Sequence, residues 1–248
     1  MKKLTIVTPV FNGAHLLKDT LESLKNQKNP NIEYIVIDGD SKDGIEDLIE
    51  GYKGLVSVFI SEPDKGMYDA LSKGLKLATG DYICYLNAGD LLFPNATQAI
   101  IEVMSSNRIE WITGYRSVCN ENNQVTRVEL PFRYTNSLIS KGVYGRFLPY
   151  IQQESTVWSN GLNSKLDLDT LKGLKLAGDY FLWKSFSKYK TLEVAKLPFG
   201  IFKIHEGQLS ERLKSYKKEV LSFSENVGLL TFLEILIEGI FWLFDCRL

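Results

Sequence analysis

The sequence contains few cysteines, and its opposite charges are almost balanced. Three cysteines lie far apart among 248 residues, and no CxxC pair indicates a zinc site. A disulfide framework is therefore not expected, and the odd number of cysteines favours a reducing compartment such as the cytoplasm. A net charge of −1 provides no overall field for nucleic acid or anionic lipid, so a nucleic-acid partner is not expected.

Several sequence motifs are also absent. The chain has neither GxGxxG nor GxxxxGK[ST], so a bound phosphate would be held by a metal ion and scattered cations rather than by a glycine-rich loop. The N-terminus has two lysines but only a short apolar run, which is more typical of a first strand than of a signal peptide. Without an internal repeat or a low-complexity linker, one domain with a C-terminal extension is the simplest division.

Apolar strand-like segments alternate with amphipathic helical ones in the first half of the chain. This alternation with short links predicts a parallel, doubly wound α/β sheet. Expected strands are Leu4–Val7, Ile32–Ile37, Val56–Ile60 and Tyr82–Leu86, and expected helices are Ala14–Gln27, Asp43–Tyr52, Gly66–Ala78 and Pro94–Ser105.

The second half of the chain does not continue this alternation of strands and helices. A hairpin is expected from Glu110–Val118 and Gln124–Glu129, with its turn at residues 120–123. Further expected elements are strands at Glu154–Trp158, Leu192–Lys196 and Gly200–Ile204, a helix at Asp179–Tyr189, and a helix opened by basic residues from Arg212.

Polar clusters follow three of the first four predicted strands. They begin at Thr8, Asp38 and Asn87, and the last one ends the segment YICYLNAGD at Asp90. Each cluster alone is read more simply as a loop. Because the carboxyl ends of parallel strands share one edge of a sheet, the three together predict a ligand site. A carboxylate on such a turn suits a hard divalent cation shared with a phosphate.

The motifs carrying these clusters resemble those of a known family. TPVFNG, VIDGDSKDG and EPDKGMYDALSKGLKLATGDYICYLNAGD resemble, in order and spacing, the nucleotide-sugar domain of family 2 glycosyltransferases, which has the GT-A fold. YIQQESTVW, LKLAGDYFLWKSF and FKIHEGQLS are similar to acceptor-side motifs of bacterial enzymes that build surface polysaccharides. Together the motifs cover about residues 3 to 210.

The resemblance implies a fold and a division of the chain. The expected fold is α/β, a Rossmann-like GT-A sheet that is mostly parallel and flanked by helices. The nucleotide-sugar half would be residues 1–118 and the acceptor half residues 119–210, and amphipathic helices would form the extension at 211–248.

The resemblance also implies a donor site and a metal site. Asp38 matches the acid that pairs with the base, and Asp90 matches the last acid of a DxD-type motif whose other acids are replaced here. Mg²⁺ or Mn²⁺ is therefore expected at Asp90, with His205 as a helper or else an ordinary structural histidine. The expected nucleotide-sugar contacts are Thr8, Pro9, Phe11, Asp38, Asp40, Asp64, Lys65, Asn87, Ala88 and Gly89.

Asp179 matches the family's catalytic base, which takes the proton of an acceptor hydroxyl. The alternative for Asp179 is a helix N-cap, because GDYFLW opens a helical pattern. Expected acceptor or sugar contacts are Gln152, Gln153, Glu154 and Trp183. For the three polar residues the alternative is a turn, and for the tryptophan it is a place in the core.

The C-terminal segment Val227–Phe244 is long and apolar, but Glu234 and Glu238 make a membrane span costly. An interfacial helix at the inner face of the plasma membrane, preceded by the basic segment Arg212–Lys218, fits better. The alternative is a helix packed on the domain or on a partner subunit. Membrane association suits an acceptor glycan on an undecaprenyl-type lipid, as the resemblance implies.

The sequence thus predicts an inverting, metal-dependent glycosyltransferase that moves one sugar from a UDP- or GDP-linked donor. The QxxRW motif of processive relatives is absent, which favours single-sugar transfer. The alternatives are a nucleotidyltransferase on a similar sheet and a catalytically inactive nucleotide-sugar-binding module.

Overall fold

The centre of the molecule is a seven-stranded sheet with the order β10-β6-β9-β4-β1-β2-β3. The computed structural model describes residues 2–28, 31–208 and 211–245. Strands β1 to β4 run parallel, whereas β9 runs antiparallel between β4 and β6. The strands are β1 Leu4–Val10, β2 Ile32–Asp38, β3 Val58–Ser61, β4 Tyr82–Tyr85, β6 Trp111–Thr113, β9 Thr156–Ser159 and β10 Glu193–Val194. The prediction of a mostly parallel sheet is confirmed.

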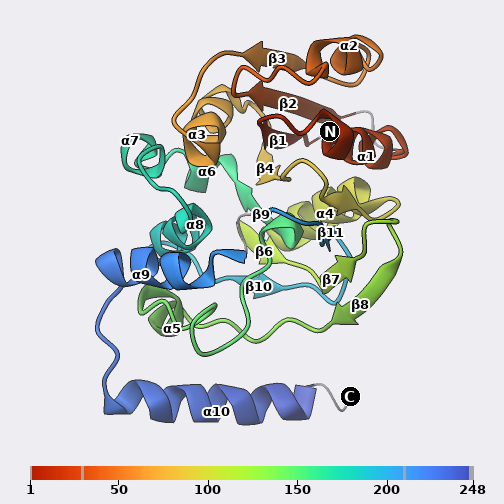
Figure 1. Cartoon of the computed structure of the whole chain (residues 1–248). Helices are drawn as coiled ribbons and strands as arrows, with labels where there is room; N and C mark the ends of the chain where they lie inside the picture. Colours follow the sequence, from red (N-terminus) through yellow and green to blue (C-terminus); the bar gives the residue numbers. More distant parts are fainter. Residues whose placement is uncertain (1, 29–30, 209–210, 246–248) are drawn as a thin grey trace.

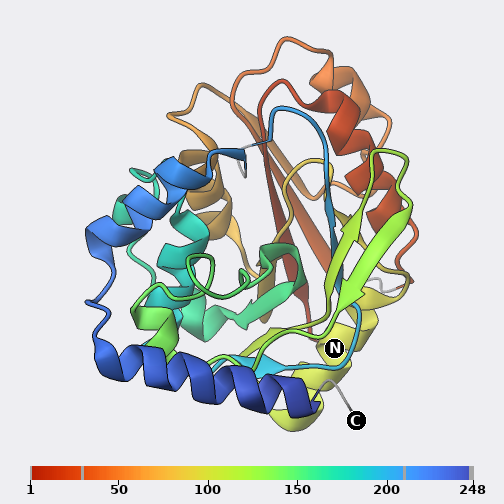
Figure 2. The same ribbon diagram turned by 60° about the horizontal axis from the view of Figure 1, so that its bottom comes forward.

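Helices cover both faces of this sheet (Figures 1 and 2). Ile6 of β1 packs with α1, α2 and α4, while its neighbour Val7 packs with α3 and α8, because successive strand residues point to opposite faces. The four predicted helices of the first half are present. The first three are shorter than expected, and the fourth begins and ends two residues later: α1 Ala14–Lys25, α2 Ile45–Glu50, α3 Met67–Leu77 and α4 Ala96–Asn107.

Strand β1 continues past its predicted end at Val7 and includes Thr8, Pro9 and Val10. The backbone polar groups of residues 7 and 9 point toward the β4 side of the strand. On that side the carbonyl of Val7 accepts a hydrogen bond from the N–H of Leu86, which follows β4. Pairing with β4 stops at Val7, so the missing N–H of Pro9 leaves no ladder bond unmade. The prediction that Thr8-Pro9 ends the strand is therefore wrong.

A smaller sheet with the order β5-β11-β7-β8 packs beside the first. The predicted strand Glu110–Val118 is wrong as a single element, because it divides into β6 in the large sheet and β7 in the small one. At the division, a Cβ on Gly114 would lie 2.5 Å from the carbonyl of Leu197, so the backbones approach closely. The hairpin turn at 120–123 is confirmed. The strands are β5 Leu91–Leu92, β7 Arg116–Cys119, β8 Val125–Glu129 and β11 Gly200–Lys203.

The remaining elements are mostly helical, and the last of them lies along the bottom of the molecule in Figure 1. The predicted strand Glu154–Trp158 begins two residues late as β9, after a single 3₁₀ turn. Within the described residues, no helix combines the length and the hydrophobicity that crossing a membrane requires. The elements are α5 Asn136–Ser140, η1 Gln153–Ser155, α6 Asn160–Asn163, α7 Leu168–Leu171, α8 Gly178–Ser187, α9 Leu213–Phe223 and α10 Leu229–Asp245.

Gly200 marks the tightest contact between β11 and the η1 turn, and it provides a test of the fold. A Cβ at this position would lie 1.9 Å from the carbonyl oxygen of Glu154. We expect Gly200→Ala to lower the free energy of unfolding by at least about 2 kcal/mol, because backbone must move to admit the methyl group. Gly54→Ala is the control, since no atom lies within 4 Å of its added Cβ. Equal urea midpoints for the two variants would contradict this packing.

Candidate active site

The loops that follow β1 and β2 are joined by hydrogen bonds at the carboxyl edge of the large sheet. The backbone N–H of Asn12 donates to the Ser41 hydroxyl at 2.7 Å, and the Asn12 side chain accepts from the N–H of Lys42 at 3.1 Å. The N–H of Ala14 donates to the Asp43 carboxylate at 2.8 Å. The parallel register brings these loops to one edge, and the hydrogen bonds fix their separation.

Asp38 ends β2 and is fully buried. Its Oδ2 atom accepts hydrogen bonds from the Ser41 N–H at 2.9 Å and from the Ser61 hydroxyl at 2.6 Å, and the Ser41 hydroxyl donates to Oδ1. Thr8 is also buried, and its hydroxyl accepts a hydrogen bond from Tyr34 at 2.9 Å. Pro9 is buried beside it in β1. These three predicted contacts lie inside the sheet, and Asp38 ties the loops after β2 and β3 together.

Four predicted donor-site residues, Phe11, Asp40, Asp64 and Lys65, are at least partly accessible at this edge. Phe11 is 64% exposed. A Cβ on the buried Gly39 would lie 3.1 Å from the Phe11 ring and 2.7 Å from the Asp64 carboxylate. Phe11 and Asp64 are therefore neighbours on either side of Gly39. Burial raises the pKa of Asp64, whose Oδ1 accepts a hydrogen bond from the Gly66 N–H at 2.7 Å. Lys65 is exposed next to it, and Asp40 pairs with Lys42 on the surface of the β2 loop.

The loop after β4 turns tightly at Gly89, whose φ is +104°. This backbone conformation suits glycine, which has no Cβ to clash. The N–H of Gly89 donates to the Thr20 hydroxyl at 2.9 Å, and that hydroxyl donates to the carbonyl of Asp90 at 2.8 Å. Asn87 and Ala88 are partly exposed at the start of the turn, whereas Asp90 is buried.

The Asp90 carboxylate is held by groups from both sheets. Its Oδ1 accepts from the N–H of Lys203 on β11 at 3.1 Å, and its Oδ2 accepts from Nε2 of Gln153 at 3.0 Å. Burial raises the pKa of Asp90 to about 7, although these hydrogen bonds act in the opposite direction.

A second buried carboxylate, Glu154, lies near Asp90. Burial first, and the charge of Asp90 second, raise the pKa of Glu154 well above its ordinary value. The Gln152 amide donates to Glu154 and also to the carbonyl of Ser117 at 2.6 Å. Of the predicted polar triplet, Gln153 thus contacts the Asp90 loop, while Gln152 and Glu154 face the small sheet.

The residues around Asp90 fit a divalent cation that receives most of its ligands from a bound anion. Within the described residues, no group of three or more His, Cys, Asp or Glu side chains is arranged to hold a metal ion. The Oδ1 atom of Asn87 is buried and has no hydrogen-bond partner. His205 is close by, since a Cβ on Gly89 would lie 4.0 Å from its ring. One carboxylate, one amide oxygen and one imidazole are suitable but incomplete donors.

Asp179 is the second residue of α8 and lies in its first turn. The N-cap residue is Ala177, so the alternative reading of Asp179 as the cap is wrong. Its Oδ1 accepts a hydrogen bond from the N–H of Tyr180 at 2.7 Å, and its Oδ2 accepts one from the Tyr216 hydroxyl at 3.4 Å. Burial raises the pKa of Asp179 to about 7, and the hydrogen bonds from Tyr180 and Tyr216 partly oppose this rise.

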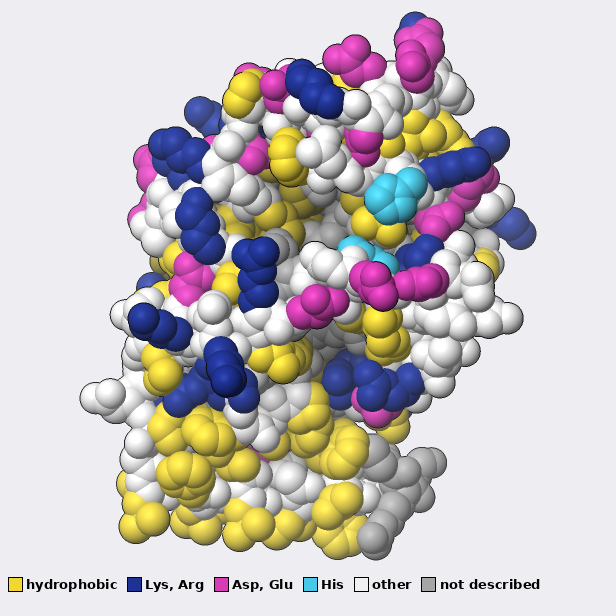
Figure 3. All heavy atoms as spheres, in the orientation of Figure 1, with side chains coloured by type: hydrophobic (Ala, Val, Ile, Leu, Met, Phe, Trp, Pro, Cys, Tyr) yellow, Lys and Arg dark blue, Asp and Glu magenta, His cyan; other side chains and the backbone are white. Residues whose placement is uncertain are grey.

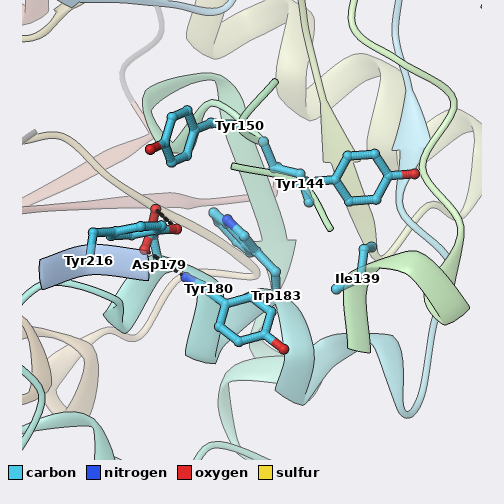
Figure 4. Close-up of a pocket in the computed structure, with 8 residues that line it drawn as sticks. Ile139, Tyr144, Tyr150, Asp179, Tyr180, Trp183 and Tyr216 are labelled. Carbon is cyan, nitrogen blue, oxygen red and sulfur yellow. Dashed lines mark hydrogen bonds between the residues drawn. The ribbon is translucent and has the colours of Figure 1, made fainter. Parts of the chain in front are cut away.

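A small cavity opens beside Asp179 and is walled mainly by aromatic rings (Figure 4). Trp183 forms part of this wall, and it is also buried in the core, where its ring stacks on Trp111 at 6.0 Å. The alternative for Trp183, a place in the core, is therefore confirmed, and its contact with a sugar stays a prediction. The lining residues are Ile139, Tyr144, Tyr150, Ile151, Asp179, Tyr180, Trp183 and Tyr216.

The segment 150–154 connects the two carboxylate regions. The Tyr150 ring packs edge-on against Tyr216 at 5.4 Å, and three residues later Gln153 donates to Asp90. Three residues span at most about 11 Å, so a short stretch of chain links the surroundings of Asp179 to Asp90. Helix α3 also borders Asp179, because the Tyr68 hydroxyl accepts from the N–H of Asp179 at 3.4 Å. The space-filling view is hollowed between the upper loops and α9 (Figure 3).

Sequence reasoning missed the residues that α9 contributes to this site. Tyr216, Val220 and Phe223 recur at helical spacing and pack on α8. That spacing was a usable signal for a packed face. The sequence prediction for this helix relied on its basic residues, which are exposed on the side opposite the packed face.

A mostly parallel sheet with acidic loops along its carboxyl edge is the architecture of enzymes that bind nucleotides at that edge. A family model described as glycosyl transferase family 2 matches residues 5–159. The chain therefore belongs to glycosyl transferase family 2, as its motifs predicted.

One curated relative is WfgD of Escherichia coli, a UDP-Glc:α-D-GlcNAc-diphosphoundecaprenol β-1,3-glucosyltransferase. It is 27% identical over 138 residues, which cover 55% of this chain and 54% of WfgD. The chain thus spans about half the length of this relative.

Two solved structures share the GT-A fold with this chain. Residues 1–349 of Staphylococcus aureus TarS in complex with UDP-GlcNAc have a TM-score of 0.66 at 16% identity, and the match covers 85% of this chain and 61% of that TarS fragment. The mannosyltransferase PcManGT of Pyrobaculum calidifontis, in complex with GDP-Man and Mn²⁺, has a TM-score of 0.61 at 15% identity. The match covers 97% of this chain and 70% of PcManGT.

The buried hydrogen bonds of Asp38 predict a structural cost for its replacement. Asp38→Asn puts an amide group where the serine donors need an acceptor, so we expect the free energy of unfolding to fall by about 2 kcal/mol. The matched variant is Asp40→Asn, two residues away and partly exposed, which should change stability by less than about 0.5 kcal/mol. Urea unfolding measures both, and equal stabilities would refute the anchoring role of Asp38.

Proposed function

We propose that this glycosyltransferase transfers one sugar from a nucleoside-diphosphate donor to a hydroxyl group, with inversion at the anomeric carbon. The observation that carries the proposal is the Asp179 carboxylate, which lies beside a cavity and is linked to Asp90 by the short segment 150–154. A base at that place removes the proton of the acceptor hydroxyl while its oxygen attacks the anomeric carbon. The bond from that carbon to the diphosphate breaks, and the diphosphate leaves with the electron pair.

The donor nucleotide would lie along the loops after β1, β2 and β3. The exposed Phe11 ring offers a face for the base, and stacking on an aromatic ring is favourable for any base. Asp64 and Lys65 offer an acceptor and a cation beside it. UDP- and GDP-linked sugars are the expected donors, and the ligands named for TarS and PcManGT support both classes.

Mg²⁺ or Mn²⁺ would be held at Asp90, with the unpartnered Oδ1 of Asn87 and the His205 ring as further donors. The Mn²⁺ in the PcManGT complex supports a metal in this fold. When bound, the ion would supply positive charge to the diphosphate. The protein holds Asp90 in place through Lys203 and Gln153.

The acceptor would enter beside Asp179, with Gln152, Gln153, Glu154 and Trp183 as the predicted contacts. A glycan, free or linked to undecaprenyl diphosphate, is the proposed acceptor in surface-polysaccharide synthesis. The diphosphoundecaprenol in the name of WfgD supports a lipid-linked acceptor. The absence of QxxRW supports transfer of a single sugar.

Replacing the proposed base tests the function. With purified protein, a panel of UDP- and GDP-sugars, Mn²⁺ and lipid-linked glycan acceptors, we expect Asp179→Asn to lower kcat by about 10³-fold while donor binding persists. Because the pKa of Asp179 is about 7, the wild-type rate should fall about tenfold for each pH unit below 7 as the base becomes protonated.

Two further variants complete this experiment. Asp169→Asn, at an exposed site on α7, should keep the wild-type rate. Asp90→Asn should weaken the dependence on Mn²⁺. Metal-dependent release of nucleoside diphosphate that persists in both the Asp90 and the Asp179 variants would refute the mechanism. Donor binding without any transfer by the wild type would favour the inactive binding module.

Helix α10 has an unusual polarity, because its polar side faces the protein. Glu234 accepts hydrogen bonds from the hydroxyls of Thr135 and Ser137 at 3.2 and 2.9 Å, at the start of α5, and Lys141 donates to it at 3.3 Å. Glu238 is buried and lies 3.9 Å from Arg133. Both acidic residues that argued against a membrane span thus face the domain, where Glu234 is hydrogen-bonded and Glu238 has, among the described residues, only the ion pair with Arg133.

The opposite side of α10 is apolar and exposed. Figure 3 shows hydrophobic side chains across the lower part of the face, with basic side chains directly above them. Arg133 packs over the Phe241 ring at 5.8 Å, at the margin of this apolar side. We propose that it enters the inner surface of the plasma membrane. The exposed apolar residues are Leu229, Leu230, Phe232, Leu233, Leu236, Ile237, Ile240, Phe241, Leu243 and Phe244.

A vesicle-binding assay tests the membrane proposal. We expect Leu233→Glu combined with Leu236→Glu to weaken binding to phosphatidylglycerol–phosphatidylethanolamine vesicles at least about tenfold, because two apolar side chains no longer enter the lipid. Val128→Glu on β8 is the control, since Val128 is 50% exposed but lies in the small sheet. Unchanged sedimentation of the α10 variant with vesicles would refute the proposal, and a dimer disrupted by the same variant would assign this side to a second copy.

A further inference from the structure

Helix α9 contacts the loop that leads into α8, the helix that carries the proposed base. The Glu219 carboxylate accepts hydrogen bonds from three consecutive backbone N–H groups, those of Lys175 at 2.9 Å, Leu176 at 2.6 Å and Ala177 at 2.7 Å. These groups directly precede α8. One side chain of α9 therefore fixes the backbone from which Asp179 projects.

A second side chain of α9 contacts Asp179 itself. The Tyr216 hydroxyl is 3.4 Å from Oδ2 of Asp179 (Figure 4). Burial, and then the charge of Asp179, raise the pKa of Tyr216 well above its ordinary value, so its hydroxyl keeps the proton that it donates. Packing against Tyr150 limits the positions that this ring can take.

The groups that face Asp179 come from several elements. Burial mainly, and the charge of Asp179 in addition, raise the pKa values of Tyr68 of α3, Tyr85 of β4 and Tyr150, which keeps these tyrosines neutral. The Lys175 ammonium donates to the carbonyl of Lys65 at 2.8 Å. The negative charge of Glu219 raises the pKa of Asp179, whereas the hydrogen bond from Tyr216 lowers the pKa of Asp179.

We propose that Tyr216 and Glu219 are positioning residues for Asp179, so that α9, which follows the acceptor-side motifs in the chain, completes the active site. This inference rests on the proposed function, in which Asp179 is the base. Neither residue touches the reacting atoms. Each acts by holding the carboxylate at the angle and depth from which it meets an acceptor hydroxyl.

The test compares Tyr216→Phe with Glu219→Gln. We expect each to lower kcat about tenfold with little change in the KM for the donor, because the base is displaced while the donor loops stay intact. The acidic limb of the pH–rate profile should move to higher pH in Tyr216→Phe, which loses a hydrogen bond to the charged form. It should move to lower pH in Glu219→Gln, which loses a neighbouring negative charge.

Tyr189→Phe and Glu206→Gln, at exposed sites, are the controls and should leave both kcat and the profile unchanged. Thermal melting checks that all variants are folded. Glu219→Asp should recover part of the lost rate, because the shorter carboxylate still accepts some of the N–H groups. Shifts in the same direction for both variants, or a lower kcat with an unmoved profile, would overturn the proposal.

A measurement that does not need activity separates this inference from the proposed function. The carboxyl carbon of Asp179 can be followed by ¹³C NMR titration of protein labelled at aspartate, with Asp179→Asn used to assign the signal. Opposite displacements of the titration midpoint in the two variants support positioning even if the wild type transfers no sugar. Identical midpoints in wild type and both variants refute it even if transfer is found.

Discussion

The buried carboxylate of Asp90 is the contact on which the site depends, because it joins the two sheets. It follows β4 of the large sheet, and it accepts hydrogen bonds from Lys203 in the small sheet and from Gln153 ahead of β9. A buried charge is costly unless hydrogen bonds compensate it. Any displacement of β11 or of the η1 turn would leave this group without donors, so the loop after β4 is fixed relative to both.

Burial also sets the proton affinity of the two acids, because it raises the pKa of both Asp90 and Asp179. For Asp179, the proposed base, a raised pKa is a better match for a reaction near neutral pH. The two groups differ in their partners. Asp90 receives its donors from β11 and the η1 turn, whereas Asp179 receives its donors from a tyrosine hydroxyl and from its own helix.

The sequence predicted those features that depend on neighbouring residues. Apolar segments and their spacing located the first four strands and helices, and the acids at strand ends located Asp38 and Asp90 correctly at the edge of the sheet. The features that the sequence did not predict depend on residues that are distant along the chain. The break at Gly114 is caused by Leu197, more than eighty residues later, and Asp179 and Tyr216 are 37 residues apart. No local pattern records that such segments meet, because tertiary packing decides it.

The C-terminal helices show why a polar stripe alone does not orient a helix. The positions of Thr231, Glu234 and Glu238 in the sequence indicate an amphipathic helix, and such a stripe normally faces water. Here the acceptors Glu234 and Glu238 face donors on and beside α5, so the larger apolar side is left outside. In water this arrangement leaves about ten large apolar side chains exposed, which is unfavourable by roughly 1.5 kcal/mol or more for each one that could be buried. Another apolar phase or surface would remove that cost, and the basic residues at its margin favour an anionic lipid surface.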